Sequence, residues 1–188
     1  MTKLAAAMCG SFCTFDKVFA ELERLRSDYE LIPIMSENAA GTDTRFGSAK
    51  DNIKRFEDIC SRAVIKSVEA AEPVGPKERP DAMLIAPCTG CTLAKLACGV
   101  SDTAVTMAAK AHLRNEKPLI LAFSTNDALS GSAENIGKLL NRKNVYIVPF
   151  RQDDPVGKPR SAQSDFSLIP AAIVAALEGR QLQPILCP

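Results

Sequence analysis

The sequence predicts an α/β protein with a doubly wound, three-layer α/β/α architecture and a mostly parallel sheet of about six strands. Short apolar runs alternate with amphipathic segments about six times along the chain. The apolar runs are continuous rather than alternating, as in strands that are buried on both faces. Turn residues such as Gly10 and Ser124 follow several of these runs.

The first third of the chain has strand and helix patterns in turn. Residues 4–9 form an apolar run, and apolar residues at helical spacing follow over 15–25, so we expect a strand, a glycine turn and a helix. Residues 31–35 predict a second strand, and residues 37–47 a polar loop long enough to be functional. Ser48, three residues before an aspartate, predicts the start of the next helix.

The middle of the chain contains the clearest motif. We expect a short third strand over 64–68 and, because of three prolines, a loop over 70–80. The apolar run 82–86 predicts the fourth strand, which breaks at Pro87 into a tight turn and then a helix over 92–97.

The remaining elements continue the alternation, with helix starts and stops given by capping residues, prolines and a final glycine, Gly179. They are a helix over 101–115 capped by Ser101 and Asp102, a strand over 119–123, a helix over 133–140, a strand over 145–148, a polar tract over 149–161 and a helix over 166–177.

Composition indicates one ordinary domain, residues 1–188. Hydrophobic residues make up 46%, charged residues 24%, and the net charge is +1, which gives no reason to expect nucleic acid or a membrane as partner. We see no secretory signal and no apolar run of about 20 residues, so we expect a cytoplasmic protein. The seven cysteines are then expected to be reduced.

Two turns are the candidate ligand site, residues 10–14 after the first strand and residues 87–92 after the fourth. In an open parallel sheet the ligand crevice lies at the carboxyl ends of the strands, where strand order reverses. Neither of the two familiar glycine fingerprints for dinucleotides or nucleoside triphosphates is present, which favours a mononucleotide such as FMN. An ordinary strand-to-helix connection is the alternative.

Many sequence words together resemble the flavin-containing cysteine decarboxylase superfamily of flavoproteins, and within it the family of bacterial dipicolinate synthase B subunits. The resemblance spans nearly the whole chain and implies a Rossmann-like or flavodoxin-like flavoprotein domain. The words are Gly10-Ser-Phe-Cys-Thr-Phe15, Thr44-Arg-Phe-Gly47, Ala71-Glu-Pro-Val-Gly-Pro-Lys77, Ala86-Pro-Cys-Thr-Gly90, Val105-Thr-Met-Ala-Ala-Lys-Ala-His-Leu-Arg-Asn115, Ser124-Thr-Asn-Asp-Ala-Leu129, Asn135-Ile-Gly-Lys-Leu-Leu-Asn141 and Val148-Pro-Phe-Arg-Gln-Asp-Asp-Pro155.

The resemblance implies an FMN-binding subunit, expected to form a homo-oligomer, that works with a dinucleotide-binding dipicolinate synthase A subunit. The pair oxidises dihydrodipicolinate to dipicolinate during sporulation. It implies that one group of residues approaches the FMN phosphate and ribityl chain and a second group faces or encloses the flavin ring. The first group is Gly10, Ser11, Phe12 and Ser36; the second is Pro87, Cys88, Thr89, Gly90, Cys91, Thr92, Ser124, Thr125 and Asn126.

Two departures from the superfamily pattern bear on chemistry. Cys91 stands where the family usually has Asn, so a thiol with one weak donor replaces an amide with two. The decarboxylase branch has a histidine near the flavin, whereas the only histidine here, His112, lies within a predicted helix. A decarboxylase mechanism is therefore disfavoured, and no catalytic residue is assigned.

The cysteines allow two other kinds of site. Cys88 and Cys91, with Cys9 and Cys13 opposite, could form a zinc or iron–sulfur site, against which stands a flavoprotein pattern that lacks a metal. Cys88 and Cys91 could also exchange disulfides, because a helix N-terminus lowers thiol pKa. Our prediction is no metal.

Basic residues in polar loops are candidates for a planar dicarboxylate substrate. Arg45 has the fork geometry for a carboxylate, and Lys158, with Arg160, offers a second contact; solvated surface charge is the alternative for each. Asp127 could move a proton or cap its turn, and His112 is more simply a partly buried helix residue than a base.

The sequence leaves three alternative functions. The first is the FMN subunit described above. The second is a self-sufficient flavin enzyme of the cysteine decarboxylase or prenyltransferase type. The third is a non-catalytic, FMN-carrying scaffold for a partner subunit.

Overall fold

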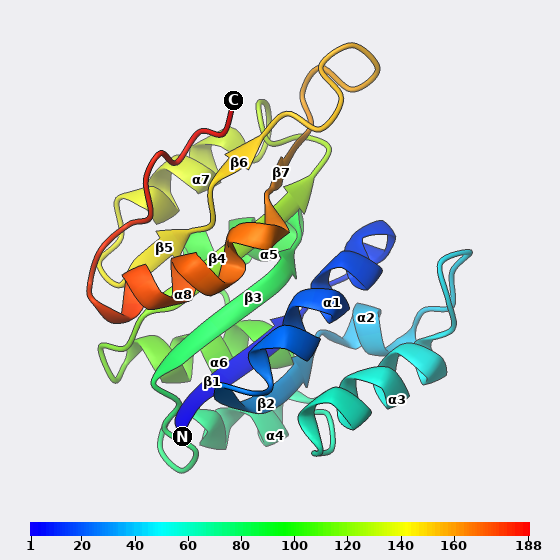
Figure 1. Ribbon diagram of the computed structural model, residues 1–188, viewed down its shortest axis with the longest axis vertical. Helices are drawn as coiled ribbons and strands as arrows, with labels where there is room; N and C mark the ends of the chain where they lie inside the picture. The colour runs from blue at the N-terminus through cyan, green and yellow to red at the C-terminus, as the bar shows by residue number, and fades with distance from the viewer.

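The computed structural model describes residues 1–188 and confirms the predicted three-layer α/β/α fold (Figure 1). Seven strands form one sheet in the order β2-β1-β3-β4-β7-β6, with β5 beside β4. The pairs among β1 to β5 are parallel, and β7 is antiparallel to β4 and β6. The strands are β1 Thr2–Met8, β2 Tyr29–Met35, β3 Ala82–Cys88, β4 Leu119–Thr125, β5 Val145–Ile147, β6 Phe150–Arg151 and β7 Ala162–Ser164.

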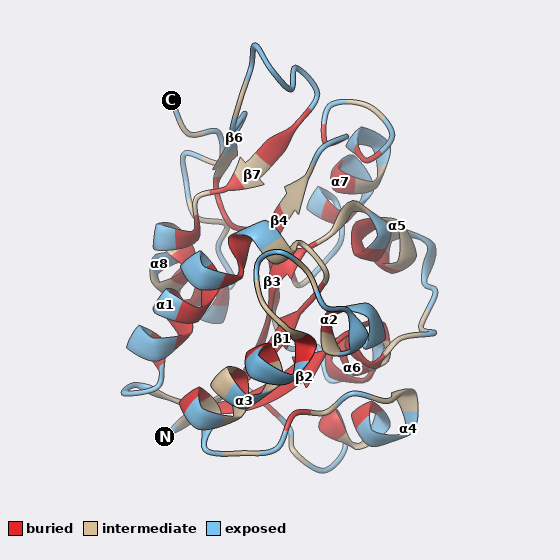
Figure 2. Ribbon diagram, turned by 90° about the vertical axis from the view of Figure 1, so that its right-hand side faces the viewer, coloured by how far each residue is buried: buried red, intermediate tan, exposed pale blue.

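Helices cover both faces of the sheet, and the buried strands lie between them (Figure 2). One core cluster joins one face to α1, α3 and α8, and a second joins the other face to α5, α6 and α7. The helices are α1 Phe15–Leu25, α2 Glu37–Gly41, α3 Ala49–Cys60, α4 Val68–Ala71, α5 Gly90–Cys98, α6 Ala104–Leu113, α7 Ala133–Leu140 and α8 Ile169–Leu177, with 3-10 turns at Phe12–Thr14, Glu72–Val74 and Phe166–Leu168.

The order of strands explains where a ligand site can form. The chain passes from β1 to β2 on one side, and β3 then returns to the other side of β1. Strand order therefore reverses at β1, and the segments that leave β1 and β3 diverge to opposite faces of the sheet. This opens a crevice at the carboxyl ends of these strands.

Several predicted boundaries are confirmed and others are corrected. Ser48 is the N-cap of α3, because its side chain accepts from the amide of Asp51, and Gly179 follows α8 with φ +74°. The predicted strand over 64–68 is wrong: only Ile65 forms a bridge, to Ile34 in β2. Ser67 instead caps α4, so the polar cap ends the extended segment.

Three further predictions are corrected, one for a helix and two for loops. The helix predicted from residue 101 begins at Ala104, because Thr103 and Thr106 form a reciprocal capping box that residues 101 and 102 cannot make. The loop predicted over 37–47 contains α2, whose N-cap is Ser36. The proline-rich 70–80 segment contains a 3-10 turn with proline in its first turn, where a missing amide costs nothing.

The polar tract over 149–161 carries structure that the sequence pattern did not indicate. Strand β6 lies at its start and β7 directly follows it, and the two form an antiparallel pair with Phe150 opposite Ser164. In Figure 1 this hairpin extends beyond the carboxyl end of β4. None of the helices is long and apolar enough to cross a membrane.

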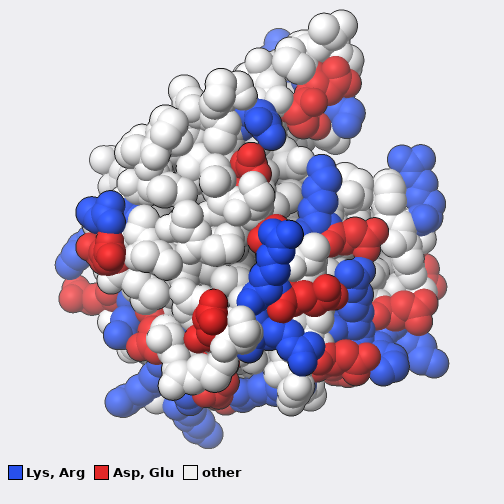
Figure 3. Space-filling view, in the orientation of Figure 1, with Lys and Arg blue, Asp and Glu red and all other residues white.

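Surface charge is distributed unevenly. Figure 3 shows basic and acidic side chains gathered over α1 and α3, whereas the surface over α8 is almost free of charge. Arg55 of α3 accounts for part of this cluster, because it pairs with Asp16 and Glu23 of α1. These exposed pairs link the two helices, and each contributes about 1 kcal/mol or less.

Candidate functional site

A cleft of about 500 Å³ lies at the carboxyl ends of β1, β2 and β3, where the strand order reverses. This volume is within the range of about 300–1,000 Å³ typical of cofactor and ligand pockets. Its walls come from the turns after the three strands and from the connection between α5 and α6. The lining residues are Cys9, Gly10, Phe12, Ser36, Glu37, Asn38, Thr42, Thr89, Cys91, Thr92, Lys95, Asp102 and Thr103.

Three hydroxyl residues at this cleft, Ser36, Thr89 and Thr103, are helix N-caps. Ser36 Oγ accepts from the amide of Ala39 at 3.3 Å, and Thr89 Oγ1 accepts from the amide of Thr92 at the same distance. Ser36 keeps its hydroxyl hydrogen free to donate, whereas Thr89 shares hydrogen bonding with the hydroxyl of Thr92 at 3.0 Å. The first amides of α5 lack partners within the helix, so this wall carries several donors.

A buried thiol forms part of the wall below these hydroxyls. The hydroxyl of Thr92 is 3.3 Å from Cys9 Sγ and donates to it. Burial raises the pKa of Cys9 to about 11, against the lowering effect of this hydrogen bond. Cys9 is therefore a neutral thiol near pH 7 and presents a weakly polar surface to the cleft.

The charged residues at the cleft are already paired. Glu37 Oε1 accepts from the amide of Ala104 at 2.9 Å and so satisfies the start of α6. Lys95 Nζ lies 2.8 Å from Asp102 Oδ1, and this contact raises the pKa of Lys95 and lowers the pKa of Asp102. An anion in the cleft would therefore bind chiefly through hydroxyl and amide donors.

A second polar cluster lies beside the start of α5. Asp127 Oδ1 accepts from Thr125 Oγ1 at 2.5 Å and from Ser132 Oγ at 2.8 Å, and these bonds lower the pKa of the Asp127 carboxyl. A Cβ on Gly90 would come within 2.7 Å of Thr125 Oγ1 and of Ser132 Oγ. Glycine is thus required here for α5 to approach the end of β4.

The structure brings together about half of the residues predicted to bind FMN. Those that line the cleft are Gly10, Phe12, Ser36, Thr89, Cys91 and Thr92. Ser11 lies in the adjoining turn, and its carbonyl accepts from Thr14. Pro87 and Cys88 belong to β3, and Gly90 packs against the β4 end instead.

The predicted residues at the end of β4 and just after it are not among the lining residues of the cleft. Ser124 and Thr125 end β4, where Ser124 Oγ accepts from Gln163 of β7 and Thr125 donates to Asp127. Thr125 lies close to Gly90 at the start of α5. Asn126 follows in an exposed turn.

The predicted substrate contacts lie in two separate loops. Arg45 stacks on the ring of Phe46 at 4.8 Å in the loop before α3. Lys158 lies in the loop between β6 and β7, 3.9 Å from Asp153. Neither residue lines the cleft, and Arg160 is exposed in the same loop as Lys158.

The alternative metal and redox sites are not formed. No group of three or more His, Cys, Asp or Glu side chains is arranged to hold a metal ion. All seven cysteines are free; Cys9 and Cys88 are buried, whereas Cys13 and Cys91 are exposed. Burial raises the pKa of Cys88 well above its usual value, which opposes the disulfide exchange considered for Cys88 and Cys91.

His112 lies at the amino-terminal end of β4, whereas the cleft lies at the carboxyl ends of the strands. It is fully buried near the end of α6, and its Nε2 is 2.9 Å from the carbonyl of Pro118, just before β4. Burial lowers the pKa of His112, so the neutral ring donates through Nε2 while Nδ1 has no partner. It cannot act as a base in the cleft.

Sequence reasoning missed half of the cleft. The missed residues lie in α2 and directly after it, on α5, and on the connection between α5 and α6. They are Glu37, Asn38, Thr42, Lys95, Asp102 and Thr103. The polar run after Ser36 was a usable signal, because it follows the strand next to β1.

The donor set of the cleft fits FMN. The turn at Gly10 and the free hydroxyl of Ser36 suit a phosphate and a ribityl chain. The first amides of α5 and the thiols of Cys9 and Cys91 offer donors and a weakly polar surface for a flavin ring. Lys95 and Asp102 compensate each other, which leaves Glu37, bound to the start of α6, as the one carboxylate of the lining without an ion pair.

The fold and the cleft define a class: doubly wound α/β proteins with a mononucleotide-sized cleft at the switch point of the sheet. The chain belongs to the Flavoprotein family, whose model matches residues 2–172. The match to this family agrees with the resemblance that the sequence motifs indicated.

Individual relatives make the similarity more specific. The chain is 42% identical over 185 residues to the B subunit of dipicolinate synthase of Bacillus subtilis (strain 168), covering 98% of this chain and 92% of that protein. The crystal structure of the dipicolinate synthase B subunit from Bacillus halodurans has a TM-score of 0.91 and 39% identity, covering 100% of this chain and 96% of that one. The predicted resemblance to this family of subunits is confirmed.

A more distant structure shows the breadth of the family. A dodecameric FMN-dependent UbiX-like decarboxylase from Escherichia coli O157:H7 has a TM-score of 0.64 and 29% identity, covering 79% of this chain and 80% of that chain. The fold of this chain is thus shared with a decarboxylase described as FMN-dependent and dodecameric.

Proposed function

We propose that this chain is the FMN-binding subunit of a dipicolinate synthase, working with a separate A subunit in the cytoplasm to oxidise dihydrodipicolinate to dipicolinate. The observation that carries the proposal is the cleft at the switch point, whose donors are hydroxyls and helix amides rather than cations. The similarity to two dipicolinate synthase B subunits supports the choice of reaction and partner.

The chain's own residues would hold the cofactor at two places. The turn at Gly10–Phe12 and the hydroxyl of Ser36 would bind the phosphate and ribityl chain. The wall formed by Thr89, Cys91 and Thr92 would face the ring and exclude water from one side. Bound FMN would supply a two-electron acceptor for a substrate that loses two electrons and two protons on becoming aromatic.

A decarboxylase or prenyltransferase acting alone is the second candidate, since it has the same fold and cofactor. The cleft argues against the decarboxylase, because none of its lining residues is a histidine and His112 lies at the opposite end of the strands. Its lining cation, Lys95, is held by Asp102.

Paired serine variants test cofactor binding. Ser36 and Ser67 are N-caps with the same 3.3 Å contact, but only Ser36 lines the cleft. Each change to alanine should cost about 1 kcal/mol of stability. Only Ser36→Ala should also weaken FMN binding, by about fivefold to tenfold for one lost hydrogen bond. Flavin fluorescence titration measures the affinity, and equal affinities in both variants would contradict the assignment.

Reconstitution tests the reaction. Dihydrodipicolinate oxidation should require this chain, FMN and the A subunit together. Activity without the A subunit would favour the self-sufficient enzyme. Full activity after removal of FMN, with this chain still required, would favour a non-catalytic scaffold.

A further inference from the structure

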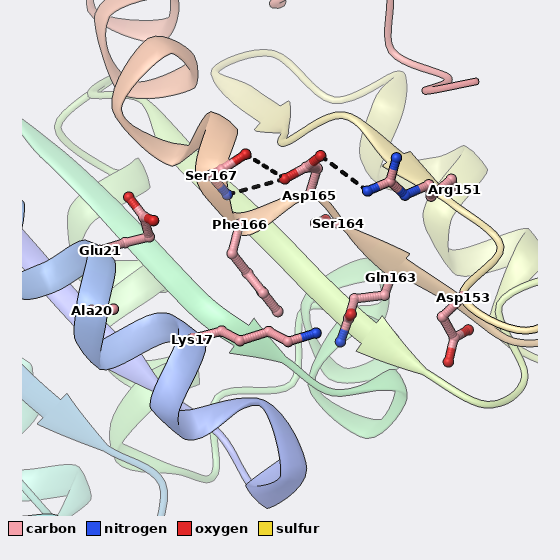
Figure 4. A pocket seen from close by; sticks show the side chains of 10 residues that line it. All are labelled: Lys17, Ala20, Glu21, Arg151, Asp153, Gln163, Ser164, Asp165, Phe166 and Ser167. Carbon is pink, nitrogen blue, oxygen red and sulfur yellow. Dashed lines mark hydrogen bonds and ion pairs between the residues drawn. The ribbon is translucent and has the colours of Figure 1, made fainter.

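The pockets outside the switch-point cleft differ in the charges that line them. Figure 4 shows the pocket at Glu21, which lies between α1 and the hairpin of β6 and β7 and is lined by acidic and basic side chains. Its acids are paired within the chain, since Glu21 accepts from Arg24 and Asp165 accepts from Arg151. The chain itself therefore largely balances the charges of this pocket.

A pocket of about 440 Å³, which we call the basic pocket, lies where the C-terminal end of α5 meets α6 and the residues after α7. Three of its lining residues are cations and none is acidic. It shares no lining residue with the switch-point cleft, although Ser101 of the basic pocket directly precedes Asp102 of the cleft. The cations are Lys110, Arg114 and Arg142, and the large apolar lining residues are Leu96, Val100 and Leu113.

The three cations of the basic pocket have no acidic partner. No carboxylate of the chain lies within 4.0 Å of Lys110, Arg114 or Arg142. Lys110 and Arg114 are also four residues apart at the end of α6, a spacing at which like charges repel. The chain therefore leaves this concentration of positive charge uncompensated.

Hydrogen bonds bring two of the charged groups to the end of α5. Arg142 Nη1 donates to the carbonyl of Leu96 at 3.0 Å, and Lys110 Nζ donates to Ser101 Oγ at 3.4 Å. One cation suffices to satisfy a free carbonyl at this helix end, so the other two exceed what α5 needs. A guanidinium has five N–H donors and an ammonium has three, so both groups keep donors for a ligand.

Apolar side chains lie beside these cations. The chain turns back after α5 at Gly99, where φ is +73° and the amide of Val100 donates to the carbonyl of Lys95 at 2.8 Å. This turn leaves Val100 43% exposed in the wall of the pocket, whereas Leu96 is buried and Leu113 half-buried. A ligand with an apolar body would remove Val100 and Leu113 from water.

The charges and the apolar wall together define a class of ligand. An inorganic anion would neutralise the cations but leave the apolar wall in water. An uncharged apolar molecule would cover the wall but leave three cations together, and a single carboxylate would leave an excess of two. A dianion on an apolar body meets both conditions, and the volume of the pocket is in the range of small-molecule sites.

We propose that the basic pocket binds a small organic dianion with an apolar body. Two carboxylates or one phosphate ester can supply the charge, because arginine binds both groups through paired N–H donors. The site is separate from the switch-point cleft and independent of the proposed function.

The test is isothermal titration calorimetry of the full chain at low ionic strength, where exposed charges are screened least. Phthalate is the dicarboxylate probe and phenyl phosphate the phosphate probe. The controls are benzoate, with one charge, and succinate and inorganic phosphate, which lack the ring. At least one of the two probes should bind about tenfold or more tightly than every control, and the tighter probe identifies the charged group. If neither probe binds, or if a control binds equally well, the proposal is overturned.

Charge variants locate the ligand in the basic pocket. Lys110→Gln and Arg114→Gln should each weaken binding of the better probe about fivefold or more, because each removes one charge contact. Lys50→Gln, on exposed α3, and Arg26→Gln, at the C-cap of α1 as Arg114 is at that of α6, should leave the affinity unaltered. All four residues are exposed, so folding should survive each change. Unchanged affinity in both pocket variants would exclude this site.

A third variant tests the apolar wall. Val100→Ser should weaken binding of the ring-bearing probe about threefold or more, because less apolar surface is then buried against the ring. Val156→Ser makes the same change at a residue that is 95% exposed in the loop between β6 and β7, and should have no effect. Equal affinities in these two variants would contradict an apolar contact in the basic pocket.

Discussion

Single side chains determine how tightly the cleft binds a cofactor. Cys91 is exposed at the start of α5, where the superfamily usually has an asparagine. Thr92 donates a buried hydrogen bond to Cys9, and burial keeps this deeper thiol neutral in spite of that bond. The polarity of the cleft wall at the start of α5 therefore depends on the side chain at position 91.

Cys91→Asn should tighten FMN binding by about threefold to tenfold, because an amide contributes stronger donors than a thiol. Cys98→Asn is the matched control, since Cys98 is also exposed but lies at the far end of α5. Flavin fluorescence quenching gives both affinities. Weaker binding in Cys91→Asn would show that the thiol itself is preferred.

His112 should make stability depend on pH. Burial lowers its pKa below the usual 6.5, so the unfolded chain takes up a proton at higher pH than the folded chain does. The free energy of unfolding should therefore fall as pH decreases from about 7 toward 5. His112→Gln keeps a donor for Pro118 and removes the titration, so this fall should become smaller.

Urea denaturation of the original protein and of His112→Gln at several pH values measures how His112 affects the free energy of unfolding. Lys110→Gln, on the exposed side of the same helix, is the control and should keep the pH dependence of the original protein. Since His112 is the only histidine, an unchanged dependence in His112→Gln would mean that folding does not lower the pKa of His112.

At the scale of elements, α5 has to approach the end of β4 closely. Gly90→Ala should cost about 1–3 kcal/mol, because the new Cβ would lie 2.7 Å from two hydroxyl oxygens. Gly137→Ala is the matched change in α7, where no atom lies within 4 Å, and it should stabilise the chain by about 0.5–1 kcal/mol. Urea denaturation should give opposite signs, and equal signs would contradict the close packing at Gly90.

At the scale of the whole molecule, the cleft joins segments that follow three strands. A ligand there binds only the folded chain and should raise its melting temperature. Saturation at about 100 times the dissociation constant corresponds to about 2.7 kcal/mol, or about 5–10 °C for a chain of this size. Riboflavin, which lacks the phosphate, should give a clearly smaller rise in differential scanning fluorimetry. Equal shifts in melting temperature with FMN and riboflavin would show that the phosphate makes no stabilising contact in the cleft.

The sequence by itself determined the fold class, the parallel core strands and the family. These follow from local patterns, namely apolar runs of strand length such as residues 82–88 and capping residues such as Ser48. It also identified the two turns at the switch point, because strand ends carry their turn residues with them in the chain.

Only the tertiary structure decided which residues share a cavity. Lys95 and Asp102 join the cleft because α5 and its connection to α6 lie beside the turns after β1 and β2. Arg45 lies outside the cleft, where it stacks on the neighbouring ring of Phe46. The pocket at Glu21 depends on contacts between α1 and the distant hairpin of β6 and β7. Such contacts leave no periodic trace in the sequence, because they are set by the packing of whole elements.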